Sequence, residues 1–284
     1  GHKPIALLGS ATGMIGDPSG KSEERKLLSE EEIEQNLKGI EQQVKKLLRS
    51  DGATGYKLVR NDSWFKKISF VDFLRDVGKH FSVNMMLGKD SVKSRLENRE
   101  QGISYTEFSY MLLQAYDFYH LMTANGCRLQ IGGSDQWGNI TAGIELIRRK
   151  SPPGAPAAHG FTFPLVTTKA GTKFGKTEAG AVWLDAKRTS PYRFYQFWLN
   201  TADVDAGRYL RIFCDLPDEE LQALDRRMTA EPDARPVQRQ LAETLTTLIH
   251  SEAETQKAIE ASRVLFGESI ANVDRETLLD NFSD

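Results

Sequence analysis

The sequence predicts an α/β protein, in which a parallel sheet with covering helices is followed by a small all-α domain. Short apolar runs beside glycine-rich or polar turns predict buried strands over 5–8, 128–131 and 161–167. Apolar residues recur at helical spacing between these runs, over 33–48, 70–87, 107–120 and 139–150. Strands that alternate with helices are typical of a parallel sheet. From Asp218 onward only the helical spacing remains, which indicates a separate helical domain.

Local signals place the ends of several helices. Ser29 and Glu32 form a capping box before the first long helix, and Ser251 and Glu254 form another near the end of the chain. Gly267 is a plausible C-cap for the last of these helices. The composition changes after about Pro191, so we expect a first domain over 1–190 and a helical domain over 191–284.

Composition limits the class of protein. The chain has 284 residues, of which 39% are hydrophobic and 27% charged, and this is ordinary for a soluble globular protein. No run of about eighteen apolar residues is present, so no membrane span is expected. The net charge of −2 means that a nucleic-acid contact must be local. Cys127 and Cys214 lack metal-ligand spacing and fit a reduced cytoplasmic setting, and the histidines predict no metal site.

The first segment that could bind a ligand or take part in a reaction follows the strand over 5–8. Its residues 13–22 end in Gly-Lys-Ser and resemble a phosphate-binding loop. Ile15 stands where that loop requires glycine, and Pro18 lacks the backbone N–H that a phosphate cradle would use. The plainer interpretation is a glycine-rich turn with a solvated Lys21.

The second segment, over 129–139, follows the next strand. Ligands of open α/β sheets bind beyond the carboxyl ends of the strands. Gly132 and Gly133 would let a ligand ring approach the backbone there. Asp135 could accept hydrogen bonds from ribose hydroxyls, and Gln136 could hold a carboxylate or an amide. The alternative is a simple turn with Asp135 as the N-cap of the next helix.

The third segment, over 169–177, is a glycine-punctuated loop with three lysines and two threonines. Lysines on such a loop suit a polyphosphate whose charge grows in the transition state. A solvated hairpin tip would have the same composition, and the sequence by itself leaves both interpretations open.

The fourth segment is the helix over 105–118. Tyr110, Gln114 and Asp117 are spaced to lie on one face of it. Asp117 stands in an apolar stretch, where a charge is costly unless it is paired or hydrogen-bonded. A buried carboxylate aimed at a ligand hydroxyl explains it and would reject an analogue without that hydroxyl. The alternative is a polar residue that closes a local network.

Together these segments resemble the bacterial-type tyrosyl-tRNA synthetases of class I, over essentially the whole chain. The most specific elements are GDPSGKSEER at 16–25, FLRDVGKHFSVN at 73–84, the helix within 102–118, LQIGGSDQWGNI at 129–140, and KFGKT at 173–177. KFGKT matches the KMSKS loop of class I. The resemblance implies a Rossmann-like catalytic domain followed by a helical anticodon-recognition domain. It also implies ATP as a substrate, accompanied by Mg²⁺, together with tyrosine and tRNA(Tyr).

The resemblance also implies a role for each matching position. The tyrosine ammonium would be held by Asp17, Tyr110 and Gln114, with Thr12 and Asn61 nearby. Asp117 would accept from the tyrosine phenol, and Gln130 and Gln136 would help to place the amino acid. The ATP would contact Gly132, Gly133, Asp135 and Lys176. The departing pyrophosphate would be stabilised by Lys173, Lys176, Thr177, Lys21 and Arg25. No acid–base residue and no protein-held metal is implied, because positioning and electrostatics suffice.

Two elements of the resembling family have no match here. Its His-x-Gly-His element, which binds the ATP phosphates, falls upstream of the strand over 5–8, and its S4-like RNA-binding module falls after Asp284. We therefore expect weak or absent adenylate formation by the chain as it stands. The family is dimeric and cytoplasmic, and binds neither DNA nor membranes. The stretch 73–86, with Phe81, Met85 and Met86, is a candidate interface or ordinary core. The basic cluster 148–150 could contact a tRNA backbone. The alternative is a solvated helix end, where positive charges interact favourably with the helix dipole.

Three other functions compete with this one. A tryptophanyl-tRNA synthetase shares the fold, but the helix over 105–118 and the GGSDQWGN segment argue against it. A non-catalytic RNA-binding or scaffold protein on the same fold fits the missing upstream element, but not Asp117 or the loop over 173–177. A P-loop phosphotransferase is weakened by Ile15 and Pro18.

Overall fold

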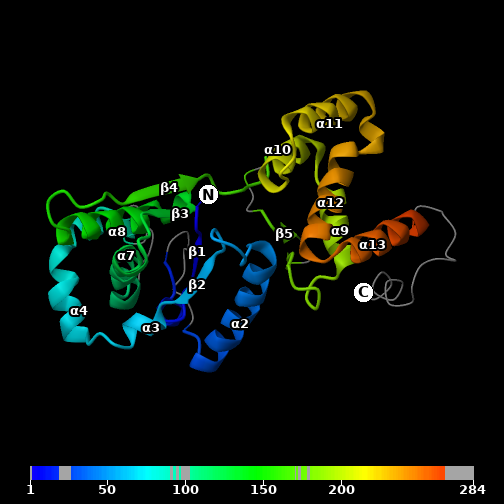
Figure 1. Cartoon of the computed structure of the whole chain (residues 1–284). Helices are drawn as coiled ribbons and strands as arrows, with labels where there is room; N and C mark the ends of the chain where they lie inside the picture. The colour runs from blue at the N-terminus through cyan, green and yellow to red at the C-terminus, as the bar shows by residue number, and fades with distance from the viewer. Residues whose placement is uncertain are drawn as a thin grey trace. The chain divides into compact units, whose positions relative to one another are not determined.

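The computed structural model describes residues 2–18, 27–89, 92–93, 96, 103–169, 171, 174–177 and 180–265. The chain separates into two compact units, Gly1–Leu165 and Val166–Asp284. This division comes before the boundary expected at 190. The reason is that Val166, Phe174, Val182 and Leu184 pack against the core of the helical unit. Figure 1 shows both units and labels their longer helices and most of their strands.

The described residues of the first unit form four strands and the helices between them. Its strands are β1 (Ile5–Leu8), β2 (Lys57–Arg60), β3 (Leu129–Gly133) and β4 (His159–Phe163). Its longer helices are α2 (Glu30–Leu47), α7 (Tyr105–Asn125) and α8 (Trp137–Lys150). Its short helices are α1 (Thr12–Ile15), α3 (Asp62–Phe65), α4 (Phe70–Asp76), η1 (Gly78–His80), α5 (Val83–Leu87) and η2 (Ser134–Gln136).

The strands form two parallel pairs. β1 pairs with β2, and β3 pairs with β4 in the register Leu129 to His159 through Gly133 to Phe163. Each pair is joined through helices, so each is a βαβ unit. The expected parallel arrangement is therefore present, as two two-stranded sheets within the described residues. One face of the second pair packs on α8, whereas Leu129, Ile131, Phe161 and Phe163 on the other face are exposed.

Side-chain chemistry explains where the elements begin and end. Ser29 and Glu32 make the expected capping box at the start of α2, whose Ile33 and Leu37 pack on Leu8. Ser104 caps α7, and Gly126 ends it in the left-handed conformation. β4 ends at Phe163, earlier than expected, because Pro164 follows and lacks a backbone N–H.

The expected helix over 70–87 is broken into α4, η1 and α5. Ser82 begins a new helix by accepting a hydrogen bond from the backbone N–H of Met85. Phe81 and Met86, together with Phe73, are buried against α7 and α8. These three side chains therefore belong to the core and are not available to a partner.

The basic end of α8 is engaged within the unit. Arg148 and Arg149 both pair with Glu145. Arg149 also donates to the carbonyl of His80, and Lys150 donates to the carbonyl of Asp76. These contacts tie α8 to η1 and the end of α4, and they favour a structural role for the cluster over the tRNA contact.

Among its described residues, the second unit is helical apart from one small hairpin and the connecting loops. The hairpin pairs β5 (Lys176–Thr177) with β6 (Gly180–Ala181) in antiparallel fashion. The helices are α9 (Pro191–Leu199), α10 (Asp203–Phe213), α11 (Asp218–Ala230), η3 (Pro232–Ala234), α12 (Pro236–Ile249) and α13 (Glu252–Leu265). Ser251 accepts from the backbone N–H of Glu254 before α13, which is one of the two hydrogen bonds of the expected capping box. Gly267 lies outside the described residues. Within the described ranges, every helix falls short of what crossing a bilayer requires.

A substitution at Gly160 tests how closely the β3–β4 pair packs on α8. A Cβ at Gly160 would lie 2.5 Å from Cγ2 of the buried Ile140. We expect Gly160→Ala to lower the free energy of unfolding of the first unit by about 1–3 kcal/mol, because the core must shift to admit the methyl group. Gly39→Ala is the matched control, since nothing lies within 4 Å of that position in α2. It should raise stability by about 0.5–1 kcal/mol. Chemical denaturation of both variants measures the difference, and equal stabilities would contradict the packing argument.

Candidate functional site

A cavity of about 1020 Å³ lies in the first unit. It is lined by residues of β1, of the turn after β1, of α7 and of β3. Five of the side chains selected from the sequence line it: Thr12, Tyr110, Gln114, Asp117 and Gln130. The cavity therefore brings three separate segments of the chain to one place.

Helix α7 supplies three of these side chains. Tyr110, Gln114 and Asp117 come from successive turns of the helix and line the same cavity. A neighbouring side of α7 packs closely on α8. A Cβ at Gly143 of α8 would lie 3.0 Å from the ring of Phe118, so glycine allows the two helices to approach. This packing fixes the side of α7 that faces the cavity.

Asp117 is a buried carboxylate, only 2% exposed. Its Oδ2 accepts a hydrogen bond of 3.0 Å from Nδ2 of Asn61, and its Oδ1 accepts one of 2.8 Å from Nε1 of Trp64. Trp64 in turn stacks on His120 at 4.3 Å between ring centroids. Both donors come from the segment just after β2, so the end of this strand holds the carboxylate of α7 in place.

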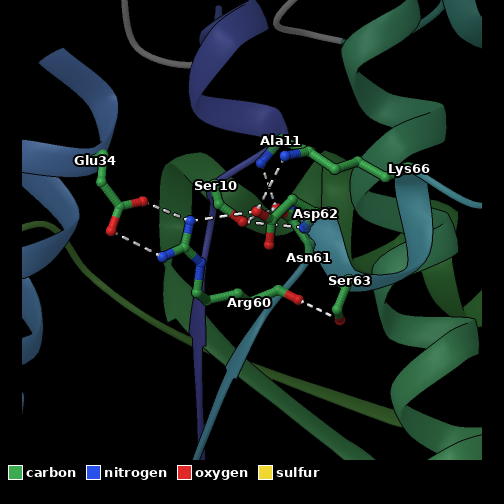
Figure 2. A network of polar contacts seen from close by, with 8 residues as sticks. All are labelled: Ser10, Ala11, Glu34, Arg60, Asn61, Asp62, Ser63 and Lys66. Carbon is green, nitrogen blue, oxygen red and sulfur yellow. Dashed lines mark hydrogen bonds and ion pairs between the residues drawn. The ribbon is translucent and has the colours of Figure 1, made fainter. Parts of the chain in front are cut away.

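Asn61 is held by a polar network at the ends of β1 and β2 (Figure 2). Its Oδ1 accepts from the backbone N–H of Ala11 at 2.7 Å and from Ser10 at 3.3 Å. Its Nδ2 donates to Thr12 at 2.9 Å as well as to Asp117. Asn61 is fully buried, and these four contacts fix which amide atom faces Asp117. It therefore stands behind the carboxylate and does not line the cavity.

The same network anchors β2 to helix α2. Arg60 makes two hydrogen bonds to the carboxylate of Glu34, at 3.1 and 2.8 Å, and one of 3.2 Å to Asp62 (Figure 2). A two-pronged arginine–carboxylate pair has a defined geometry. It holds the strand end from which Asn61 projects.

Burial dominates the titration of Asp117. Burial raises its pKa from 3.8 to about 7, and the hydrogen bonds from Asn61 and Trp64 oppose this by stabilising the charged form. Unfolding returns the pKa to its ordinary value, so the unfolded chain loses the proton first as pH rises. This group therefore lowers the free energy of unfolding between about pH 4 and pH 7, and its contribution is constant above that range.

Gln136 joins the two glycine-rich segments. Its Oε1 accepts from Gln114 at 3.2 Å and from Asn139 at 3.4 Å, and its Nε2 donates to Asp17 at 2.8 Å. The side chains of Asp17, Gln114 and Gln136 thus lie close together, although they come from three different segments.

The end of β3 is shaped by its glycines. A Cβ at Gly132 would lie 3.1 Å from Cβ of Gln136, and one at Gly133 would lie 2.7 Å from Oδ1 of Asp135. Glycine at these positions lets Gln136 and Asp135 turn back over the strand. Helix α8 begins with Gln136 as its N-cap and has no side-chain cap, so Asp135 is not the cap of that helix. Earlier in the strand, Oε1 of Gln130 is buried without a hydrogen-bond partner.

The lysine-rich segment belongs to the second unit. Lys21, Arg25 and Lys173 lie outside the described residues. Lys176 and Thr177 form β5, for which the backbone is described. No group of three or more His, Cys, Asp or Glu side chains that could hold a metal gathers in the described part of the chain.

Sequence reasoning missed Trp64 and Ser10. A signal was present, because Trp64 follows Asn61 by three residues and an indole N–H is a donor that pairs with a buried acceptor. The strand β2 that carries this segment was also missed. Its four residues, Lys-Leu-Val-Arg, are too short and too charged to stand out by periodicity.

Comparison with known proteins identifies the class. The profile of the family described as tRNA synthetases class I (W and Y) matches residues 1–267. The chain belongs to this family, and its Rossmann-like parallel strands and helical second unit are those of the class I fold.

Two individual proteins show which members of the family this chain is similar to. The chain is 54% identical over 285 residues to a tyrosine–tRNA ligase of Roseiflexus castenholzii, covering 100% of the chain and 66% of that protein. It is 53% identical to the tyrosine–tRNA ligase of Staphylococcus carnosus, with coverages of 100% and 66%. The chain thus spans about two thirds of the length of these curated relatives.

A solved structure agrees with these relatives. A C-terminally truncated mitochondrial tyrosyl-tRNA synthetase of Aspergillus nidulans superposes with a TM-score of 0.81 at 33% identity. The match covers 93% of this chain and 77% of that one.

The indole of Trp64 reports the charge of Asp117. We expect its N–H resonance to titrate with a midpoint near pH 7, because the hydrogen bond weakens when the carboxylate is protonated. Asp117→Asn should abolish this transition. Asp76→Asn should leave it unchanged, since pairing with Arg75 holds the pKa of Asp76 below its ordinary value. NMR of the indole resonances between pH 5 and pH 9 measures the effect, and a Trp64 resonance that does not respond over this range would refute the assignment.

Proposed function

We propose that this chain carries the tyrosine-activating part of a tyrosine–tRNA ligase, together with its adjoining helical domain. The reaction joins tyrosine and ATP to form tyrosyl-adenylate, and then transfers the tyrosyl group to tRNA(Tyr). The observation that carries the proposal is Asp117, a buried carboxylate that is held by two fixed donors and lines the cavity. The resemblance to tyrosine–tRNA ligases over the whole chain supports it.

Asp117 is suited to recognise a phenol. Each carboxylate oxygen can accept two hydrogen bonds, and Asn61 and Trp64 use one on each oxygen. Capacity therefore remains for the O–H of a tyrosine side chain. Phenylalanine would bury the carboxylate without this donor, and such a site discriminates strongly between the two amino acids. The role we propose for Asn61 is to hold Asp117, since its own amide is fully engaged.

The ammonium and carboxylate of tyrosine need polar partners at the other end of the site. We assign the ammonium to Tyr110, Gln114 and Asp17, with Thr12 beside them. The hydrogen bonds among Gln114, Gln136 and Asp17 support this assignment, because they gather acceptors from three segments. The unpaired buried Oε1 of Gln130 is a further acceptor on the cavity wall.

We assign the ATP to the segment after β3 and to the lysine-rich segments. Gly132, Gly133 and Asp135 would receive the ribose, with Lys176 at the phosphates. Lys173, Lys176, Thr177, Lys21 and Arg25 would stabilise the departing pyrophosphate. A carboxylate oxygen of tyrosine attacks the α-phosphorus, and the bond from this phosphorus to the pyrophosphate breaks. A ribose hydroxyl of the tRNA end then attacks the tyrosyl carbonyl, and AMP leaves.

Magnesium enters this proposal only with the nucleotide. Mg²⁺ is commonly bound through substrate phosphates and retains several waters, so it does not need a complete set of protein ligands. The described residues offer no cluster of their own for it. The helical second unit is proposed to meet the anticodon region of tRNA(Tyr), and the reduced state of Cys127 and Cys214 fits a cytoplasmic enzyme.

Calorimetric titration with tyrosine, phenylalanine and a non-hydrolysable tyrosyl-adenylate analogue tests the proposed function. We expect tyrosine and the analogue to bind, and phenylalanine to bind at least a hundredfold more weakly or not at all. Asp117→Asn should remove most of this preference, because the amide cannot accept from Asn61 and Trp64 and also from the phenol. Asp76→Asn is the control on the same unit. Selective binding of tryptophan would indicate the tryptophan branch of the family, and RNA binding without any amino-acid binding would indicate a scaffold.

We also propose that the chain forms a homodimer through α4 and α5. Phe70, Val71, Leu74, Val83 and Leu87 are large apolar side chains on these short helices, and all are exposed. Several exposed large apolar side chains on two neighbouring helices of the sequence are typical of an interaction site.

Two valines allow a matched test of this surface. Val71 on α4 is 71% exposed, and Val204 on α10 is 62% exposed. We expect Val71→Glu to give a monomer in sedimentation velocity, because a charge would be buried in the interface, and Val204→Glu to leave the dimer intact. A wild-type chain that is monomeric at micromolar concentration, or a dimer that survives Val71→Glu, would exclude this interface.

A further inference from the structure

The ring of Phe174 lies inside an aromatic cluster of the helical unit. Its centroid is 5.0 Å from that of Tyr209 and 5.2 Å from that of Phe213, both on α10. It is also 5.5 Å from the ring of Trp198 and 5.8 Å from that of Phe197, both on α9. Two helices therefore enclose one side chain from a segment that otherwise carries lysine, glycine and threonine.

Hydrogen bonds attach the N-terminal side of this segment to the helical unit. On the N-terminal side, the backbone N–H of Lys169 donates to Oδ1 of Asp205 at 2.8 Å. The hydroxyl of Tyr209 donates to the carbonyl of Thr167 at 3.1 Å, and Arg208 donates to the same carbonyl at 3.3 Å. Asp205 is buried, so its bond to Lys169 is shielded from water. All three partners lie on α10.

The segment also closes on itself around Phe174. The backbone N–H of Phe174 donates to the carbonyl of Val166 at 3.3 Å, and that of Val182 donates to the carbonyl of Gly175 at 3.1 Å. Gly175 adopts a positive φ of 78°, which lets the chain turn immediately after the ring. The chain thus enters the cluster at Phe174 and leaves it within one residue.

We propose that Phe174 is a positioning residue, whose ring fastens the lysine-rich segment to α9 and α10. Lys173 precedes Phe174 directly and Lys176 follows it by two residues, so the backbone that carries both lysines is held at its centre. This inference rests on the proposed function only in giving these lysines the pyrophosphate as their target. A cation stabilises a transition state only when it is held close to its productive geometry, and a free segment would spend most of its time elsewhere.

The proposal accounts for an aromatic residue between lysines. A solvated hairpin tip would expose an apolar ring to water, whereas packing the partly buried ring of Phe174 against four aromatic side chains stabilises the attached segment. This stabilisation offsets the entropy lost when the segment is ordered. The attachment also makes the backbone at Phe174 a part of the helical unit, so it moves together with α9 and α10.

Limited proteolysis of the 284-residue chain tests the attachment without any need for activity. Trypsin cleaves after lysine, and we expect cleavage within 169–176 to be at least tenfold faster in Phe174→Ala than in the wild type. Phe174→Leu, which keeps much of the packing, should fall between them. Leu224→Ala removes a buried side chain of the same core from α11 and controls for general destabilisation. It should leave cleavage within 169–176 unchanged. Equal cleavage rates in the wild type and Phe174→Ala would overturn the proposal.

Tyrosine binding and pyrophosphate exchange separate this inference from the proposed function. We expect Phe174→Ala to bind tyrosine like the wild type. In a chain that also carries the upstream His-x-Gly-His element, we expect the same substitution to lower kcat for exchange about a hundredfold with an unchanged KM for tyrosine. Unchanged exchange in Phe174→Ala would overturn the positioning role. A wild-type chain that binds no tyrosine would count against the proposed function, while the proteolysis result would still decide whether Phe174 fastens the segment.

Discussion

The carboxylate of Asp117 is the group on which the architecture of the first unit depends. A charge that is almost fully removed from water is costly unless donors surround it, and here the donors are an amide and an indole that follow β2. Neither donor could be placed without the network that holds Asn61 at the ends of β1 and β2. The capped α7, the strand pair and the Arg60–Glu34 pair can therefore be understood as successive supports of one carboxylate.

Much of this arrangement can be predicted from the sequence, because it depends on interactions between residues that are close together in the chain. The capping box at Ser29, the strand over 5–8 and the polar face of α7 follow from spacing within a few residues. Asp117 could be selected because a charge in an apolar helix needs an explanation. The pairing of Asp117 with Asn61 and Trp64 could not be predicted, because these two residues lie more than fifty positions before it in the sequence. Only the fold makes them neighbours.

The differences from expectation have the same origin. The break in the helix over 70–87 depends on a serine that caps locally, but its benefit comes from burying Phe81 and Met86 against α7 and α8. The division of the chain falls at Val166 and not at 190, because Phe174 and its neighbours pack with helices that come later in the sequence. Tertiary contacts determine where this helix breaks and where the two units divide, and the composition of the sequence contains no information on these contacts. The roles of the site residues toward ligands stay predictions.

The pairing of the strands has a consequence for how the molecule behaves in solution. Within the described residues, β1 and β3 each form a ladder with a single neighbour, and both line the cavity. The remaining edge of each strand offers backbone donors and acceptors, beside the exposed apolar face of Leu129, Ile131, Phe161 and Phe163. Edges of this kind act as templates for another extended chain. These two edges thus have the backbone chemistry that a further extended segment needs for pairing.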